Sequence, residues 1–190
     1  MSAMRATTGA IFLDRDGVLI ENRPDYVKTW DEVEIFPHTF AAMRKLAQTG
    51  LPIIVVTNQS AIGRGIITAG FVEEIHRRLI AEVEANGGRI DAVYYCPHHP
   101  QESCDCRKPL PGMLRQAARE WNLDLNASFL VGDAVSDIET ARAVGAQGVL
   151  VRTGRGEEQA AMLADHSDWN VLVVADLDAA ADFIPACLAR

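Results

Sequence analysis

The chain has 190 residues, of which 48% are hydrophobic and 23% charged, and its formal net charge is −8. This composition is typical of a folded globular protein, and the length suits one domain spanning residues 1–190. A surface this acidic repels nucleic-acid backbones and anionic membranes, so we expect neither as a partner. The first ten residues lack the apolar segment of a secretory signal, and no apolar run is long enough to span a bilayer. We therefore expect a cytoplasmic protein, which we take to be a monomer.

The first half of the chain alternates apolar strands with helices. Ala10–Leu13 is an apolar run that ends at acidic residues, and Pro37–Gln48 has the composition of a helix. Ile53–Thr57 is β-branched and apolar on both faces, as buried parallel strands are. Thr68 can cap a long helix, and Ala92–Cys96 is the next expected strand.

The second half continues this alternation after an irregular loop over residues 97–111, which is rich in Pro, Cys and His. The expected elements that follow are, in chain order, the helix Gly112–Trp121, the strand Ser128–Gly132, the helix Ser136–Val144, the strands Gly148–Val151 and Asn170–Val174, and a helix near Leu177–Leu188. This order predicts an α/β fold, namely a doubly wound parallel sheet with helices on both faces and a minimal cap. In such sheets the site lies beyond the carboxyl ends of the strands.

Polar residues follow four of the predicted strands. They are, strand by strand, Asp14 and Asp16; Thr57, Asn58, Gln59 and Ser60; Arg107 and Lys108; and Asp133 and Asp137. A carboxylate can attack phosphorus, and a second carboxyl group can move the proton. Oxygen ligands select Mg²⁺, while lysine and hydroxyl groups bind phosphoryl oxygens. The set therefore suits phosphoryl transfer, in which positioning and charge neutralisation dominate catalysis.

Four motifs in this order resemble those of the haloacid dehalogenase-like phosphatases. They are Phe12–Gly17, Val55–Asn58, Lys108, and Gly132-Asp133 with Asp137 four residues later. A single Asp-x-Asp-Gly sequence more often forms an ordinary turn. The ordered set, with each motif after a predicted strand, favours the catalytic interpretation.

The resemblance implies a role for each matching residue. Asp14 would be the covalent nucleophile and a Mg²⁺ ligand, and Asp16 the general acid and base, with its main-chain carbonyl on the metal. Thr57 and Lys108 would bind the phosphoryl group. Asp133 would ligate Mg²⁺, while Asp137 would orient the metal site or bind water on the metal.

The loop after the third strand resembles that of a zinc-containing subfamily of these phosphatases. The implied ligands are Cys96, His98, Cys104 and Cys106. Three thiolates and one imidazole would close a tetrahedral site, which points to a structural Zn²⁺. The alternative is a set of free thiols without a metal.

The subfamily resemblance implies a small phosphorylated metabolite as substrate. A heptose 1,7-bisphosphate that loses its 7-phosphate, in surface polysaccharide biosynthesis, is one expectation, and histidinol phosphate is the alternative. A zinc-stapled binding module without activity is an alternative of another class. The expected substrate contacts are Asn22, Asp25, Thr57, Asn58, Gln59, Ser60, Arg107 and Lys108. For Asn22 and Asp25 a plain surface loop is an equal alternative, and for Arg107 a solvated charge.

Overall fold

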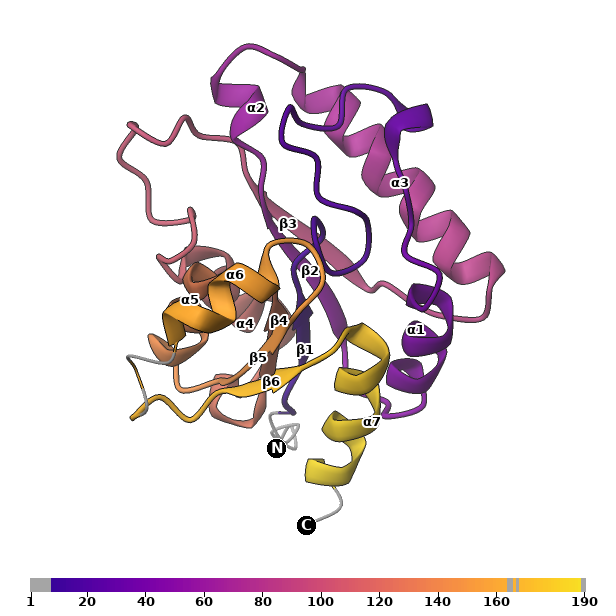
Figure 1. Ribbon diagram of the computed structural model, residues 1–190, viewed down its shortest axis with the longest axis vertical. Coiled ribbons are helices and arrows are strands. Elements are labelled where there is room, and N and C mark those ends of the chain that lie inside the picture. Colours follow the sequence, from indigo (N-terminus) through magenta and orange to yellow (C-terminus); the bar gives the residue numbers. More distant parts are fainter. Residues whose placement is uncertain (1–7, 164–165, 167, 189–190) are drawn as a thin grey trace, which may run out of the picture.

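The computed structural model describes residues 8–163, 166 and 168–188, and a parallel sheet lies at its centre (Figure 1). Within the described residues six strands pair in the order β3-β2-β1-β4-β5-β6. Their bounds are Ile11–Leu13 (β1), Ile53–Asn58 (β2), Ala92–Cys96 (β3), Phe129–Gly132 (β4), Gln147–Val151 (β5) and Leu172–Val174 (β6). The register is continuous across the central strands, where Phe12 pairs with Ile54 on one side and Leu130 on the other. Residues 1–7, part of the stretch that was compared with a secretory signal, lie outside the described part of the chain.

Helices connect the strands. They are α1 (Thr39–Ala47), α2 (Ser60–Gly63), α3 (Ala69–Ala85), α4 (Gly112–Trp121), α5 (Val135–Arg142), α6 (Gly156–Leu163) and α7 (Leu177–Leu188), with short 3₁₀ turns at Trp30–Glu32 and Leu125–Ala127. Thr68 caps α3, as the sequence predicts, and its side-chain oxygen accepts a hydrogen bond from the Phe71 N–H at 3.2 Å. No helix in the described part of the chain combines the length and apolarity that crossing a bilayer requires.

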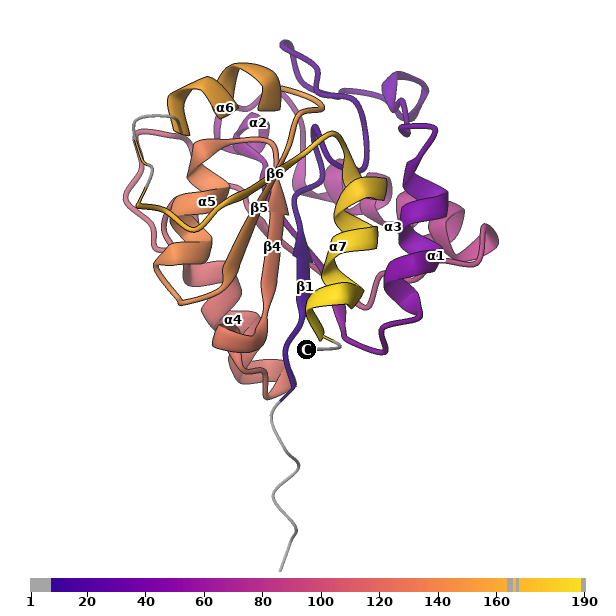
Figure 2. The ribbon, with the colours of Figure 1, turned by 60° about the horizontal axis from the view of Figure 1, so that its bottom comes forward.

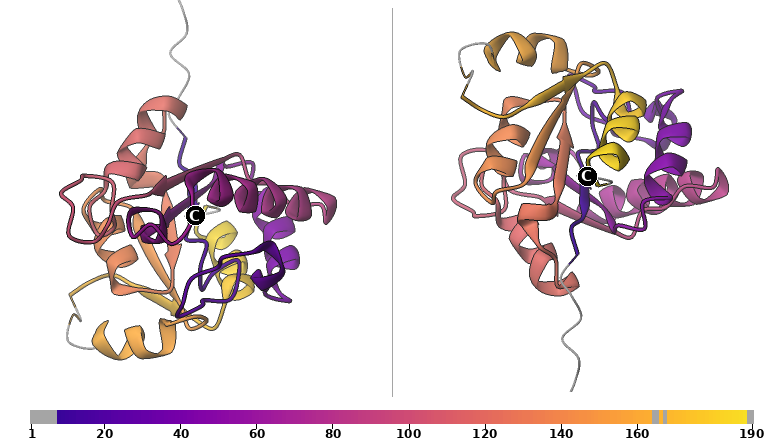
Figure 3. Two further views of the ribbon diagram at one scale, coloured as in Figure 1. Left: turned by 90° about the horizontal axis from the view of Figure 1, so that it is seen from above. Right: turned by 90° about the horizontal axis from the view of Figure 1, so that it is seen from below.

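Alternating strand residues build two apolar cores, one on each face of the sheet. Ile11 and Leu13 point into the core shared with α1, α3 and α7, whereas Phe12 points into the core shared with α4 and α5. The two groups of helices lie on opposite sides of the sheet (Figures 2 and 3). Because both faces are covered, the strands are apolar throughout, which is why they read as continuous hydrophobic runs.

The predicted fold is confirmed, but two helices escape the sequence analysis. Helix α2 is a single turn, and α6 lies in a stretch for which we predicted no element. Only Gly156 and Leu163 are buried in α6, so it lacks the apolar stripe that reveals a surface helix.

The direction in which successive strands are added to the sheet reverses between β1 and β4, which makes this position the topological switch point. The chain passes from β1 outward to β2 and β3, then returns to the other side of β1 with β4. Loops that leave β1 and β4 diverge to opposite faces, which opens a crevice at their carboxyl ends. The residues that follow these two strands, Asp14 and Asp133, therefore face a shared crevice.

Candidate active site

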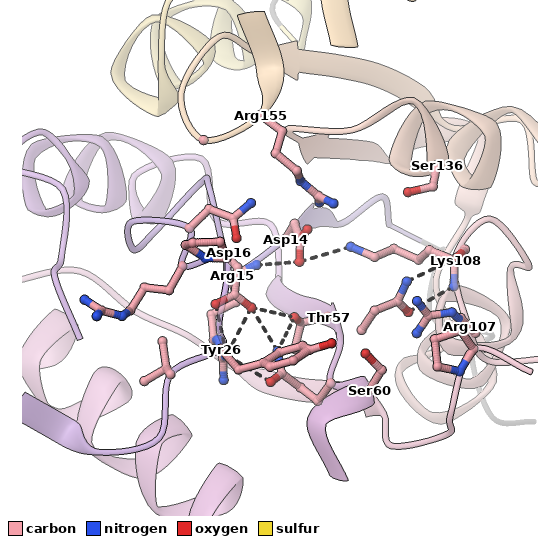
Figure 4. A pocket seen from close by; sticks show the side chains of 18 of the residues that line it. Asp14, Arg15, Asp16, Tyr26, Thr57, Ser60, Arg107, Lys108, Ser136 and Arg155 are labelled. Carbon is pink, nitrogen blue, oxygen red and sulfur yellow. Dashed lines mark hydrogen bonds and ion pairs between the residues drawn. The ribbon is translucent and has the colours of Figure 1, made fainter. Parts of the chain in front are cut away.

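A cavity of about 680 Å³ lies at this crevice (Figure 4). Five segments far apart in the sequence supply its walls. The lining residues are 14–16, 22–24, 26 and 27, 57–60 and 64, 100, 107 and 108, 136, 154 and 155. All four predicted catalytic residues, Asp14, Asp16, Thr57 and Lys108, are among them.

Three buried carboxylates and one lysine cluster at the cavity, where Asp14 and Lys108 belong to the lining and Asp133 and Asp137 lie beside Asp14 outside it. Oxygens of Asp14, Asp133 and Asp137 all lie within 4.8 Å of one another. Lys108 Nζ lies 3.0 Å from Asp14 Oδ1 and 2.6 Å from Asp137 Oδ1, and it donates to the Val56 carbonyl at 3.0 Å. We predicted that Asp137 orients the metal site or binds water on the metal, and in the structure its carboxylate pairs with Lys108.

Burial raises the pKa of Asp14 to about 7, and the carboxylates of Asp137, Asp133 and Asp16 add to the effect, while Lys108 opposes it. Lys108 and Arg155, which pairs with Asp133 at 3.0 Å, bring two positive charges to three clustered carboxylates, so negative charge remains in excess. A buried group of hard oxygen donors with excess negative charge matches the preference of Mg²⁺. The residues present therefore fit this ion, with Asp14 and Asp133 as side-chain ligands.

Two glycines allow the chain to close tightly around Asp133. Gly17 and Gly154 both have positive φ, at 85° and 60°, and a Cβ on Gly17 would overlap the Asp133 carboxylate. Arg155 completes the enclosure, since its main-chain N–H donates to Asp133 Oδ2 at 2.9 Å and its Nη2 to Oδ1 at 3.0 Å. In Figure 4, Arg155 and Lys108 approach Asp14 from different sides. We did not predict Arg155, because no strand-end motif contains it.

The Asp16 carboxylate points away from the acidic cluster. Arg15 Nη2 lies 3.0 Å from both of its oxygens, and Gln59 Nε2 donates to Oδ2 at 2.9 Å. Although burial opposes ionisation, Arg15 and Gln59 together lower the pKa of Asp16. Any contribution of Asp16 to a metal site would come from its main-chain carbonyl, as the resemblance implies.

The predicted substrate contacts fall into three groups. Asn22, Ser60 and Arg107 line the cavity, and Arg107 Nη1 is buried without a hydrogen-bond partner. The amide of Asn58 is occupied, because it exchanges two 3.1 Å hydrogen bonds with the main chain of Lys108. Asp25 is outside the lining and pairs with Lys28 at 2.7 Å. The structure thus places Asp25 away from the site.

Gln59 lines the cavity and is also bonded to protein at both ends of its amide. Its Nε2 donates to Thr57 Oγ1 at 2.9 Å as well as to Asp16, and its Oε1 accepts from Arg15 at 3.0 Å. Gln59 therefore supports other side chains of the site, and its contact with substrate stays a prediction. A sequence pattern identifies such a residue as polar and near the site but does not show where its amide points.

The four predicted zinc ligands converge in the loop before α4. Their ligand atoms lie within 4.8 Å of one another. Cys96 Sγ is 3.8 Å from Cys104 Sγ, and His98 Nδ1 is 3.5 Å from Cys96 Sγ and 3.2 Å from Cys106 Sγ. A tetrahedral ion with Zn–S bonds of about 2.3 Å separates its sulfurs by about 3.8 Å. The residues present fit Zn²⁺ with no open position.

The fold and this arrangement of strand-end carboxylates and lysine define the class of haloacid dehalogenase-like hydrolases. A family profile described as HAD-hydrolase-like matches residues 105–180. A Pseudomonas aeruginosa protein named D-glycero-beta-D-manno-heptose-1,7-bisphosphate 7-phosphatase is 46% identical over 77% of this chain and 82% of its own length. A Salmonella typhi protein of the same name is 40% identical over 93% of this chain and 97% of its own. The chain belongs to this family of haloacid dehalogenase-like phosphatases.

A solved structure agrees with this assignment. The D,D-heptose 1,7-bisphosphate phosphatase of B. bronchiseptica, complexed with magnesium and phosphate, superposes with a TM-score of 0.86 at 35% identity. The match covers 93% of this chain and 98% of that one. That protein binds the metal that the acidic cluster of this chain fits.

Proposed function

We propose that this protein is a Mg²⁺-dependent phosphatase that removes the 7-phosphate of D-glycero-beta-D-manno-heptose 1,7-bisphosphate in heptose nucleotide biosynthesis. The observation that carries the chemistry is the buried cluster of Asp14, Asp133 and Asp137, in which Lys108 pairs with Asp14 and Asp137, beside a 680 Å³ cavity that Asp14 and Lys108 line. The substrate and its anomer follow from the names of relatives at 46% and 40% identity.

In the first half of the reaction, Asp14 attacks the phosphorus atom of the 7-phosphate. A bond forms between its carboxylate oxygen and phosphorus while the bond from phosphorus to the C7 oxygen breaks. Against the effect of burial, Arg15 and Gln59 lower the pKa of Asp16 in the free protein, but the negative charge of the bound phosphates raises it again and favours the protonated form. From that form Asp16 transfers its proton to the departing oxygen, so the sugar leaves as an alcohol. Lys108 and the hydroxyl of Thr57 bind the equatorial phosphoryl oxygens.

In the second half, water attacks the phosphorus of the aspartyl-phosphate on the side opposite Asp14. Asp16, deprotonated by the first step, accepts the proton of this water. The bond between phosphorus and Asp14 breaks, which restores the carboxylate and releases phosphate. When bound by Asp14, the Asp16 carbonyl and Asp133, Mg²⁺ supplies charge neutralisation for the phosphoryl group.

The walls of the cavity suit a substrate with a second phosphate. Five arginines line it, namely Arg15, Arg23, Arg64, Arg107 and Arg155. They concentrate positive charge at one opening of a chain whose net charge is −8. Arg107 is the best candidate to bind the retained 1-phosphate, since its Nη1 lacks a partner and a guanidinium binds phosphate in a bidentate manner.

The zinc loop has a structural role in this proposal. It runs from Cys96 to Cys106 and leads directly into Arg107 and Lys108. A closed metal site fixes a loop that has too few apolar residues to pack by itself. The ion thereby holds the two cationic side chains in place.

Three further features belong to the same proposal. The chain functions as one domain over residues 1–190, since the described strands form a single sheet. We also propose that it acts as a monomer. It works in the cytoplasm, where sugar phosphates are made.

The test compares kcat/KM for the heptose bisphosphate and for histidinol phosphate, with ³¹P NMR to identify the phosphate that leaves. We expect the bisphosphate to be the better substrate and its 7-phosphate signal to disappear first. Faster turnover of histidinol phosphate would move the assignment to that substrate. Release of the 1-phosphate would contradict the orientation, and the absence of turnover would favour the binding module.

A further inference from the structure

A closed set of hydrogen bonds surrounds the Asp16 carboxylate. Arg15 Nη2 reaches both of its oxygens at 3.0 Å, and Gln59 Nε2 donates to Oδ2 at 2.9 Å. Arg15 Nη2 also donates to Gln59 Oε1 at 3.0 Å, so the three side chains bond to one another in a ring. The Arg15 side chain is 3% exposed and that of Asp16 is 22% exposed, so the guanidinium is buried while the carboxylate reaches the cavity.

His76 holds the other end of the guanidinium. It projects from α3, is 6% exposed, and places Nε2 at 3.1 Å from Arg15 Nη1. Arginine has only donors, so His76 Nε2 must be the acceptor, and its ring must be neutral. Burial first, and the charge of Arg15 second, lower the pKa of His76 to about 3. The histidine is therefore neutral at every pH at which the enzyme would work.

We propose that His76 and Arg15 are positioning residues that aim the carboxyl group of Asp16 at the leaving oxygen. The inference rests on the proposed function, in which Asp16 moves the proton. A guanidinium is planar, so bonds at Nη1 from α3 and at Nη2 from Gln59 fix the orientation of its plane. The fixed plane in turn sets the rotation of the Asp16 side chain. Proton transfer needs this alignment, because it occurs over hydrogen-bond distance.

Loss of the alignment should make the rate depend more strongly on the leaving group of the substrate. A sugar alkoxide is strongly basic and departs only as a proton from Asp16 reaches its oxygen while the P–O bond breaks. In p-nitrophenyl phosphate the leaving group is a stable anion that departs with its electron pair and needs no proton. A misaligned Asp16 therefore slows the alkyl phosphate and spares the aryl phosphate. The value of kcat/KM isolates this effect, because it contains no step after release of the first product.

The experiment compares His76→Leu with His76→Gln on the heptose bisphosphate and on p-nitrophenyl phosphate. Leucine fills the site but accepts no hydrogen bond, whereas the glutamine oxygen can still accept from Arg15. We expect His76→Leu to lower kcat/KM on the order of tenfold or more for the sugar phosphate and less than about threefold for the aryl phosphate. His76→Gln should restore most of the loss.

A matched control separates alignment from packing. Leu79 is buried one turn further along α3, at 2% exposure, and Leu79→Ala should lower the melting temperature without a rate effect that depends on the leaving group. If His76→Leu does not fold, Arg15→Lys gives the same comparison, since lysine keeps the charge and loses the planar fork. Equal losses on both esters, or no rescue by glutamine, would overturn the proposal.

The same data distinguish this inference from the proposed function. If the wild-type enzyme prefers histidinol phosphate, the substrate assignment fails. Histidinol phosphate is also an alkyl ester, so it can then replace the heptose bisphosphate in the comparison with p-nitrophenyl phosphate. A wild-type protein that hydrolyses neither kind of ester would overturn both.

Discussion

Asp14 carries the covalent chemistry, and its replacement is the most direct test of the mechanism. Asn has nearly the same shape but is a poor nucleophile, so Asp14→Asn should keep the fold and lower kcat at least about 1,000-fold, as loss of other covalent nucleophiles does. Steady-state kinetics on the bisphosphate, with circular dichroism for the fold, measures this.

The control is the same substitution at an exposed carboxylate outside the cavity. Asp25→Asn should leave kcat unchanged, because Asp25 pairs with Lys28 and does not line the site. An Asp14→Asn enzyme that kept a substantial part of the wild-type rate would exclude covalent catalysis by this residue.

Arg107 should separate the bisphosphate from smaller substrates. Arg107→Ala removes a charge-assisted contact with the retained phosphate. It should lower kcat/KM by an amount that corresponds to a loss of about 1–3 kcal/mol of transition-state stabilisation. It should change the hydrolysis of p-nitrophenyl phosphate little, since that ester has no second phosphate. Kinetics on both substrates provides the measurement.

Arg77→Ala is a suitable control, because Arg77 is exposed on α3 and pairs only with Glu74 in the described structure. Equal losses on both substrates for Arg107→Ala would place Arg107 at the reacting phosphate, not at the remote one.

The zinc loop, which runs from Cys96 to Cys106, should affect catalysis because it determines the position of Lys108. Cys104→Ser should reduce bound zinc below one equivalent, loosen the loop and displace Lys108 from Asp14, with which it pairs at 3.0 Å. We expect a loss of about 10–100-fold in kcat/KM together with lower stability. Elemental analysis and kinetics on the same preparation give both values.

Cys187→Ser is the matched control, because Cys187 lies in α7 outside the ligand cluster. It should keep its zinc and its activity. A wild-type preparation that is folded, active and free of zinc would contradict the structural role of the loop.

The stability of the whole molecule should depend on pH through His76. The folded protein holds its pKa near 3, whereas in the unfolded chain the group has its ordinary value of about 6.5. Above that value neither state binds the proton, so the contribution is constant. As the pH falls below it, only the unfolded chain takes up the proton, and the free energy of unfolding decreases by up to about 1.4 kcal/mol per pH unit until the pH nears 3.

In His76→Gln the side chain cannot take up a proton in either state, so comparison with this variant isolates the contribution of His76 to the pH dependence of stability. Between pH 7.5 and 5.0 the free energy of unfolding of the wild type should fall by about 2 kcal/mol more than that of the variant. Urea unfolding of both proteins at the two pH values measures the difference. Equal losses would show that His76 is not held neutral in the fold.

Charge is also distributed unevenly over the whole molecule. The net charge of −8 repels polyanions, yet the cavity gathers Arg23, Arg64, Arg107, Lys108 and Arg155. A small anion experiences these nearby cations more strongly than distant surface carboxylates, because screening limits each charge to about 8 Å at physiological ionic strength. An acidic protein can thus bind a bisphosphate.

The sequence by itself determined the alternation of strands and helices, the placement of Asp14, Thr57, Lys108 and Asp133 at strand ends, and the Cys/His ligand set. These features depend on local periodicity and on a topological rule, so each is visible in a short stretch of chain. Helix α6 was not predicted, because it buries too few residues for a helical period of hydrophobic residues to appear in the sequence.

Only the tertiary structure decided how the polar side chains are used. Lys108, in the loop that follows β3, pairs with Asp137 in α5. His76 contacts Arg15, which is 61 positions away in the chain. The amides of Asn58 and Gln59, which line the cavity, are bonded to protein partners. Such choices depend on which donors and acceptors the packed helices bring within about 3 Å, because buried polar groups must find partners. A sequence shows which groups are available, but packing determines which of them meet.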